Sequence, residues 1–227
     1  ARKGGGGSKP SISYDGNRIA FYSHTATLVT DDNNGIWDIF LWDKNIAKLK
    51  RVSLTADGKE RNQGNESANR IVAPAISGNG HYIAFATTAT NMVPGDINNF
   101  QDVFVYDINT NSTIIASNGS DGKPGNADSP IEQGEKIAIP FDGKWVAFST
   151  NATNLGVPAA NVVMHNMTSG KNQAVSSVIG SSVGRPSISY SGGYIVFGIG
   201  GKLDSRFPSS GIFANYTGVG PCRSCPQ

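Results

Sequence analysis

One stretch, residues 74–107, recurs along the chain and constrains its fold more than any other feature. It contains two short apolar runs on either side of the pair Asn79-Gly80, then a polar loop, then a third apolar run at 103–106. Because an Asn-Gly pair between β-rich runs is the strongest short-range hairpin signal, we expect a hairpin with a type I′ turn there. The stretch therefore predicts three short antiparallel strands.

The pattern occurs four times. Its copies align one phenylalanine in the same place, at Phe21, Phe85, Phe148 and Phe197. Short strands repeated head to tail are the sequence signature of a β-propeller, because a lone sheet cannot bury both of its faces. We therefore predict an all-β propeller of four repeats, each a four-stranded antiparallel blade. The last blade is incomplete, because no convincing outer strand follows Tyr216. The expected segments are a glycine-rich tail at 1–9, blades at about 10–73, 74–136, 137–185 and 186–216, and a cysteine-containing tail at 217–227.

Three strings carry a family resemblance: P-S-I-S-x-D-G-x-x-I-A-F from residue 10, A-T-N-x-V-P-G-D-x-N from residue 89 and D-V-F-V-Y-D from residue 102. Together they resemble the TolB-like (WD-like) β-propeller repeat over about residues 10–216. The resemblance implies a propeller that serves as a binding or scaffold module in the bacterial envelope or outside the cell. It implies no shared catalytic site.

Composition excludes several classes of function. The formal net charge is +2 and no long run of one sign occurs, so the electrostatic footprint of a nucleic-acid-binding protein is absent. No apolar run approaches the roughly 18–20 residues that cross a bilayer. We therefore expect neither a nucleic-acid partner nor membrane insertion.

The polar loop after the second strand is the best chemical lead. Oxygen side chains at alternate positions of a tight loop can surround Ca²⁺, which takes six to eight oxygen ligands. The candidate metal ligands are Asp32, Asn34 and Asp38 in the first copy and Asp96, Asn98 and Asp102 in the second. The favoured alternative is that these side chains hydrogen-bond their own backbone as turn formers, because neither loop has the bidentate glutamate of a full calcium loop. The sequence leaves calcium as the one cofactor to test.

Two cysteines, Cys222 and Cys225, are separated by two residues near the C-terminal end. Such a pair can be a redox site, half of a zinc site or a local disulfide. A small disulfide is favoured, because neither a helix after a strand nor a second ligand pair accompanies the cysteines. It indicates an oxidising compartment.

Nothing in the chain predicts catalysis. Residues 180–184 fit the G-x-S-x-G pattern, but they lie between two expected strands instead of opening a helix, and the three histidines fall in different registers of the repeat. We therefore predict a non-enzymatic binding or scaffold propeller that is extracellular, periplasmic or on the cell surface. Its partner is another protein or further copies of itself, joined into a homo-polymer through the incomplete last blade. Carbohydrate recognition stays open, as does the alternative of a gating or accessory domain of a larger hydrolase.

Overall fold

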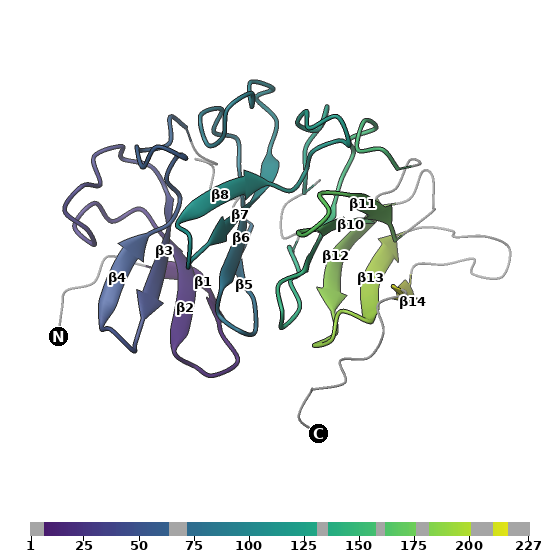
Figure 1. Ribbon diagram of the computed structural model, residues 1–227, viewed down its shortest axis with the longest axis horizontal. Coiled ribbons are helices and arrows are strands. Elements are labelled where there is room, and N and C mark those ends of the chain that lie inside the picture. Colours follow the sequence, from purple (N-terminus) through teal and green to yellow (C-terminus); the bar gives the residue numbers. More distant parts are fainter. Residues whose placement is uncertain are drawn as a thin grey trace, which may run out of the picture.

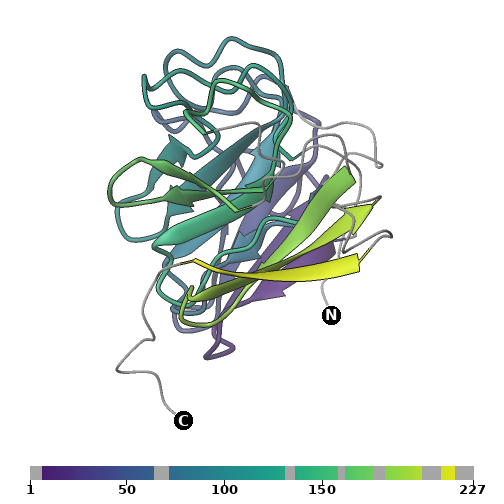
Figure 2. The ribbon, with the colours of Figure 1, turned by 90° about the vertical axis from the view of Figure 1, so that its right-hand side faces the viewer.

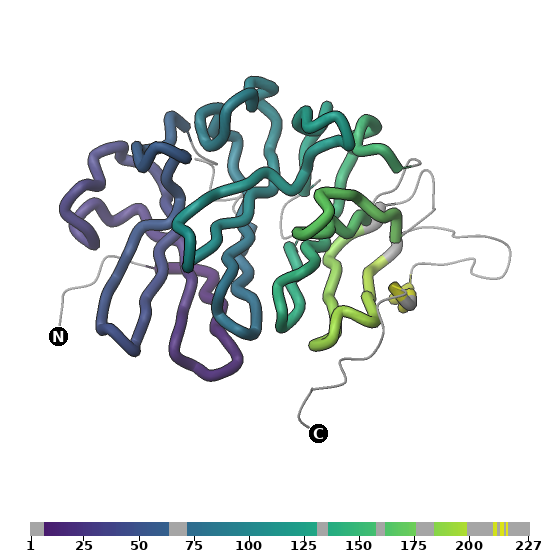
Figure 3. The backbone as a smooth tube through the Cα atoms, in the orientation of Figure 1, coloured from purple at the N-terminus to yellow at the C-terminus, as the bar shows by residue number. Residues whose placement is uncertain are grey.

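The computed structural model describes residues 7–63, 72–130, 136–157, 162–175, 182–200 and 211–217. Within these residues the regular structure consists of strands, and no α-helix occurs. No helix long and apolar enough to cross a membrane is therefore found in the described part of the chain. Four antiparallel sheets follow one another in chain order, from the first at the left of Figure 1 to the last at its right. The tube in Figure 3 follows the same path.

The first two sheets contain four strands each, in sequential order. The first consists of β1 (Gly7–Ile12), β2 (Arg18–Ser23), β3 (Asp38–Asp43) and β4 (Lys48–Arg51). The second consists of β5 (Ala75–Ile76), β6 (Tyr82–Thr87), β7 (Asp102–Asp107) and β8 (Ser112–Ile115). Phe21 pairs with Phe40 in the first sheet just as Phe85 pairs with Phe104 in the second. The sequence repeat is therefore also the structural repeat.

The third and fourth sheets contain three described strands each. The third consists of β9 (Trp145–Ser149), β10 (Val162–Asn166) and β11 (Asn172–Ala174). A single bridge between Ala138 and Ala147 takes the place of its innermost strand. The fourth consists of β12 (Ser182–Ile188), β13 (Tyr194–Gly200) and β14 (Gly211–Tyr216). The predicted four-bladed β-propeller is confirmed, and its last blade has fewer strands than the first two.

The turn between β5 and β6 differs from the one that the sequence predicts. Gly80 has a φ of 73°, but Asn79 does not have a positive φ, so the predicted type I′ turn is wrong. The Gly80 amide donates to the Ser77 carbonyl at 2.8 Å. Asn79 Oδ1 accepts hydrogen bonds from Ser77 Oγ and from the amide of His81. The asparagine side chain therefore holds a wider turn, and only the glycine after it adopts the left-handed conformation.

The hydrophobic cores lie between neighbouring blades, because alternate side chains of a strand point to opposite faces of its sheet. In β6, Ile83 and Phe85 pack in the cluster shared with the first blade. Ala84 and Ala86 pack in the cluster shared with the third. A further cluster joins the third and fourth blades around Ile195. In Figure 2 the fourth sheet is nearest the viewer, at the end of this series.

The inner turns of the blades contact one another through one register position. Tyr14 approaches Phe141 and Tyr190 edge-on, with ring centroids 5.9 and 5.7 Å apart. Phe141 stacks on Tyr190 at 4.4 Å. The second blade has Gly78 at this position, where a Cβ would lie 2.5 Å from Phe141 Cδ2. The glycine therefore leaves the room through which the first blade contacts the third and fourth.

Candidate functional site

The acidic loop between β2 and β3 is closed by two arginines of the chain itself. Asp38 is fully buried at the start of β3, and Asn34 Nδ2 donates to its Oδ2 at 2.9 Å. Arg51 Nη1 lies 3.0 Å from Asp32 Oδ1 and 3.5 Å from Asp38 Oδ2. Arg61 Nε lies 2.9 Å from Asp38 Oδ1. The three predicted metal ligands of the first blade do lie together, but the two carboxylates among them pair with guanidinium groups.

These guanidiniums supply the counter-charge for carboxylates that are buried away from solvent. The Arg51 side chain is only 2% exposed, and its Nη1 also lies 2.8 Å from Glu60 Oε1. Burial raises the pKa of Asp32, the nearby charge of Asp38 raises it further, and Arg51 opposes both effects. A buried carboxylate needs a counter-charge or a proton. The ion pairs therefore hold β4, the crossover after it and the acidic loop together.

The second blade repeats the carboxylates without the arginines. Asp102 is fully buried and Asp96 is 2% exposed. Asp102 accepts hydrogen bonds from Asn98 Nδ2 at 2.8 Å and from Ser117 Oγ at 2.5 Å. The pairing of the outer strands matches Arg51 to a position in the second blade, and the isolated β-bridge in the crossover after each outer strand matches Arg61. Both matching residues are uncharged. These are Ile115 in place of Arg51 and Gly125 in place of Arg61.

Burial raises the pKa of two carboxyls in this loop. Burial raises the pKa of Asp102 to about 7, although hydrogen bonds from Ser117 and Asn98 lower it. Burial likewise raises the pKa of Asp96. A carboxyl that titrates near neutral pH is a feature of functional sites and also of structural networks. A bound proton or cation should therefore stabilise the second loop more than the first.

Calcium binding by the six loop residues stays a prediction. Among the described residues, no group of three or more histidine, cysteine, aspartate or glutamate side chains could hold a metal ion. The side-chain oxygens of Asn34 and Asn98 accept hydrogen bonds from the backbone amides of Ile36 and Phe100, at 3.1 and 2.8 Å, as the turn-forming alternative requires. The charge balance favours the second loop for any added cation, since two guanidiniums already stand in the first.

Titration calorimetry with Ca²⁺ checks this prediction. The sequence pattern predicts heat from at most two loops, and the charge balance predicts that it comes from the second. Asp96→Asn should then remove the heat, because it deletes an oxygen charge with no guanidinium beside it. Asp32→Asn is the matched control and should leave the heat in place. No heat from the unaltered chain at millimolar calcium would end the calcium hypothesis.

The remaining sequence candidates do not form a site in the described part of the chain. Cys222 and Cys225 lie outside the described residues. Ser182, from the G-x-S-x-G pattern, begins β12 and so continues into a strand, without the helix that a nucleophile turn needs. The ring of His24 lies against Trp37, with centroids 4.5 Å apart. His165 Nδ1 contacts Asn172 Oδ1 at 2.9 Å. These histidines are therefore held in separate local contacts.

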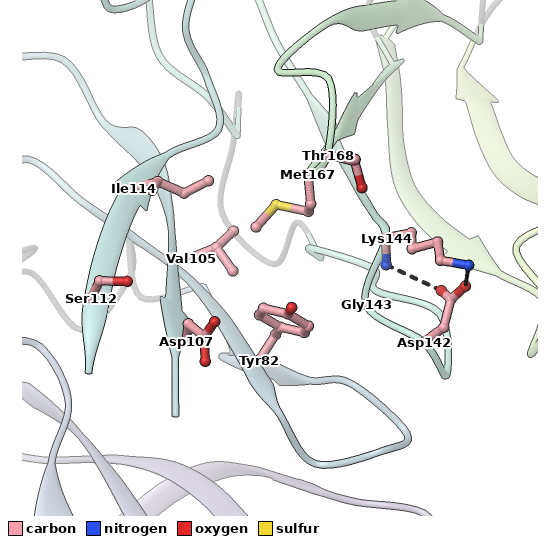
Figure 4. A pocket seen from close by; sticks show the side chains of 10 residues that line it. All are labelled: Tyr82, Val105, Asp107, Ser112, Ile114, Asp142, Gly143, Lys144, Met167 and Thr168. Atoms are coloured by element: carbon pink, nitrogen blue, oxygen red, sulfur yellow. Dashed lines mark hydrogen bonds and ion pairs between the residues drawn. The ribbon is translucent and has the colours of Figure 1, made fainter. Parts of the chain in front are cut away.

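A pocket of about 210 Å³, which no sequence pattern marks, opens between the second and third blades (Figure 4). Strands β6, β7 and β8 provide one wall, and the inner turn of the third blade and the turn after β10 provide the other. Its lining residues are Tyr82, Val105, Asp107, Ser112, Ile114, Asp142, Gly143, Lys144, Met167 and Thr168. Lys144 Nζ pairs with Asp142 Oδ2 at 3.2 Å, which leaves Asp107 as the acid without an ion pair in the described lining.

The fourth blade has an apolar face on which no described residue of another blade packs. Ile212 is 83% exposed and Val196, on the same face, is 38% exposed. The strand pairing gives Ile212 three counterparts in the other blades, and all three are fully buried between blades. These counterparts are Ile39, Val103 and Val162. The last face is therefore made of the same residue types as a blade interface, but it is uncovered in the described structure.

No family model matches this sequence, and no curated protein sequence matches it either. Solved structures do share its fold. TolB from Acinetobacter baumannii superposes with a TM-score of 0.52 at 16% identity, over 92% of this chain and 43% of that one. A prolyl endopeptidase superposes with a TM-score of 0.54 at 14% identity, over 93% of this chain and 28% of that one. A protein described as TolB from Agrobacterium tumefaciens gives 0.50 at 14% identity, over 92% and 65%.

The fold and its repeated interfaces define an all-β protein of the β-propeller class. Two of the solved chains that share this fold are described as TolB, the family that the sequence strings resemble. At these identities the likeness shows the fold alone. The chain spans less than two thirds of the length of each of the three solved chains.

Proposed function

We propose that this chain is a non-enzymatic binding and scaffold propeller of the cell envelope or the extracellular space, and that it associates with further copies of itself through its last blade. The uncovered face of the fourth blade carries this proposal. Exposed apolar surface that is built like an interior interface marks a site of protein association. The partner is accordingly a protein, and the first candidate is a second copy of the chain.

The repeat itself indicates what fits this face. At each junction between blades, apolar side chains of the next blade's second strand cover the preceding blade, as Ile83 and Phe85 of β6 cover the first. The first blade carries the matching pair, Ile19 and Phe21. Both are partly exposed, on the face of the sheet that points away from the second blade. Each copy thus offers one face of each kind at opposite ends. Such a head-to-tail contact generates a ring or a filament.

The location rests on the resemblance to TolB-like propellers, which implies the envelope or the exterior of the cell. The cysteine pair Cys222 and Cys225 suits an oxidising compartment.

Light scattering coupled to size exclusion tests self-association. The unaltered chain should elute as a species several times heavier than the 23.8 kDa monomer. Ile212→Lys should give the monomer, because a charge on this face cannot be buried against another copy. Ile97→Lys is the matched control, since Ile97 is 81% exposed in the acidic loop of the second blade. An unaltered chain that stays monomeric at 100 µM, both with calcium and with chelator, would overturn the polymer.

The alternative is a gating or accessory propeller of a larger hydrolase. The likeness to a prolyl endopeptidase, of which this chain covers 28%, is the observation that favours it. Peptide substrates incubated with the purified chain separate the two proposals. We expect no hydrolysis above the uncatalysed rate. Turnover that co-purifies with the chain through successive columns would contradict the non-enzymatic assignment.

A further inference from the structure

At the junction of the first and second blades, a cationic side chain joins the two sheets. Arg18 Nε lies 2.8 Å from Asp43 Oδ2, across the β2–β3 pair of its own blade. Its Nη1 donates to the carbonyl of Gly80 at 2.9 Å, in the inner turn of the next blade. Arg18 thus occupies the groove between the two blades with a guanidinium that is bound on both sides.

The pocket in Figure 4 lies at the equivalent place one junction further on. The strand pairing and the inner turns align the two junctions residue by residue. The matched positions are Arg18 with Tyr82, Asp43 with Asp107, and Gly80 with Gly143. The second junction therefore keeps a carboxylate and a turn glycine like those that bind the guanidinium, but the guanidinium itself is replaced by a tyrosine.

The Asp107 carboxylate is poised in the same way as that of Asp43. Asp107 Oδ1 accepts hydrogen bonds from the amides of Asn109 and Thr110, at 2.8 and 3.3 Å. In the first blade, Asp43 Oδ1 accepts the amide of Asn45 at 2.9 Å, and this leaves Oδ2 for the arginine. No side-chain donor of the described residues pairs with Asp107 Oδ2. A charge-bearing oxygen is thus available to a donor from outside.

The rest of the pocket suits the aliphatic part of a long cationic side chain. Figure 4 shows Tyr82, Val105 and Met167 facing the space at the centre of the pocket, with Asp107 beside the tyrosine. Ile114 replaces Lys50 of the first junction, so this wall carries no positive charge at that position. Long basic side chains pack their methylene stems on apolar surface and their charged heads on carboxylates or aromatic faces.

We propose that this pocket binds an arginine or lysine side chain of a partner protein, with the charged head on Asp107 and the stem on Tyr82 and Met167. The inference rests on the proposed role as a protein-binding module and names the chemistry of one partner contact. It does not involve the open face of the fourth blade. Arginine should bind better than lysine, because a planar guanidinium can bond a carboxylate with two parallel N–H groups.

The test is an NMR titration with N-acetyl-arginine amide, with the neutral analogue N-acetyl-citrulline amide as the ligand control. Amide signals of Ser112, Gly143 and Thr168 should shift with the arginine compound alone, with a dissociation constant of about 1–10 mM. Asp107→Asn should weaken binding about tenfold, the loss expected for one charge-assisted hydrogen bond. Asp121→Asn removes an exposed carboxylate away from the pocket and should change nothing.

A second variant asks whether a guanidinium on this chain can take the place of the arginine compound, as Arg18 does at the first junction. Tyr82→Arg should abolish binding of the arginine compound, because the introduced guanidinium would itself reach Asp107. Equal shifts with the citrulline compound, or unchanged affinity in Asp107→Asn, would overturn the proposal. Light scattering of Asp107→Asn should match that of the unaltered chain. A chain that assembles without binding arginine thus refutes the pocket alone, and a monomer that binds it refutes self-association alone.

Discussion

Replacing Arg51 by methionine should lower the free energy of unfolding by about 3–5 kcal/mol, as expected when one partner of a buried ion network is removed. The methionine fills much of the same volume but supplies no charge. Asp32 and Asp38 would then lie together in the interior, with Arg61 as their remaining guanidinium. Urea unfolding followed by tryptophan fluorescence at pH 7 measures the effect.

An exposed ion pair nearby provides the control. Lys59 Nζ lies 2.7 Å from Asp57 Oδ2, but its side chain is 78% exposed. Lys59→Met should therefore leave the free energy of unfolding nearly unchanged, because exposed pairs are screened by water and salt. The cost of Arg51→Met should also shrink as the pH falls toward 4, since a protonated Asp32 needs no counter-charge. Equal costs for the two variants would show that the Arg51 network does not stabilise the fold.

The sequence predicts the propeller because the same apolar residues recur at the same strand positions of each repeat. Phe85 and Ile83 recur in register, and the structure buries them against the preceding blade as the alternation of a strand requires. The predicted incomplete last blade also follows from a visible absence of strand formers after Tyr216. Both features depend on local pattern alone, and pattern is what a repeat preserves.

The two acidic loops could not be told apart from their motif. Asp32 and Asp96 have the same spacing to their partner residues, and the difference lies in residues outside the motif. Arg51 comes from the outer strand and Arg61 from the crossover, and only the fold brings them to Asp38. Comparison of the repeat positions would have revealed the signal, since the second copy has uncharged residues there. The pocket was missed for the same reason, because it results from a change at one strand position.

The unaltered chain should be more stable at pH 5 than at pH 8, and Asp102 should account for about 2–3 kcal/mol of the difference. The pKa of this carboxyl is about 7 in the folded chain and near 3.8 when unfolded, because burial disfavours the charged form. The folded state therefore holds the proton more tightly than the unfolded state. The resulting stability is fully present below about pH 4 and is lost as the pH rises through 7.

Urea unfolding of Asp102→Asn at the two pH values isolates this effect. The variant should lose about 2–3 kcal/mol less than the unaltered chain between pH 5 and pH 8, whatever its stability at either pH. Groups common to both proteins cancel in this comparison. Asp121→Asn, which removes an exposed carboxylate, should keep the full difference. Identical pH dependence in Asp102→Asn and the unaltered chain would mean that Asp102 titrates like an ordinary carboxyl.

Urea unfolding at pH 8 with added calcium tests whether the predicted cation can replace the proton on Asp102. If calcium binds the second loop, millimolar calcium should recover part of the stability that the unaltered chain loses at pH 8, because the ion supplies the counter-charge that Arg51 and Arg61 supply in the first blade. Asp102→Asn should show no such recovery. A recovery that persists in the variant would assign the calcium effect to another part of the molecule.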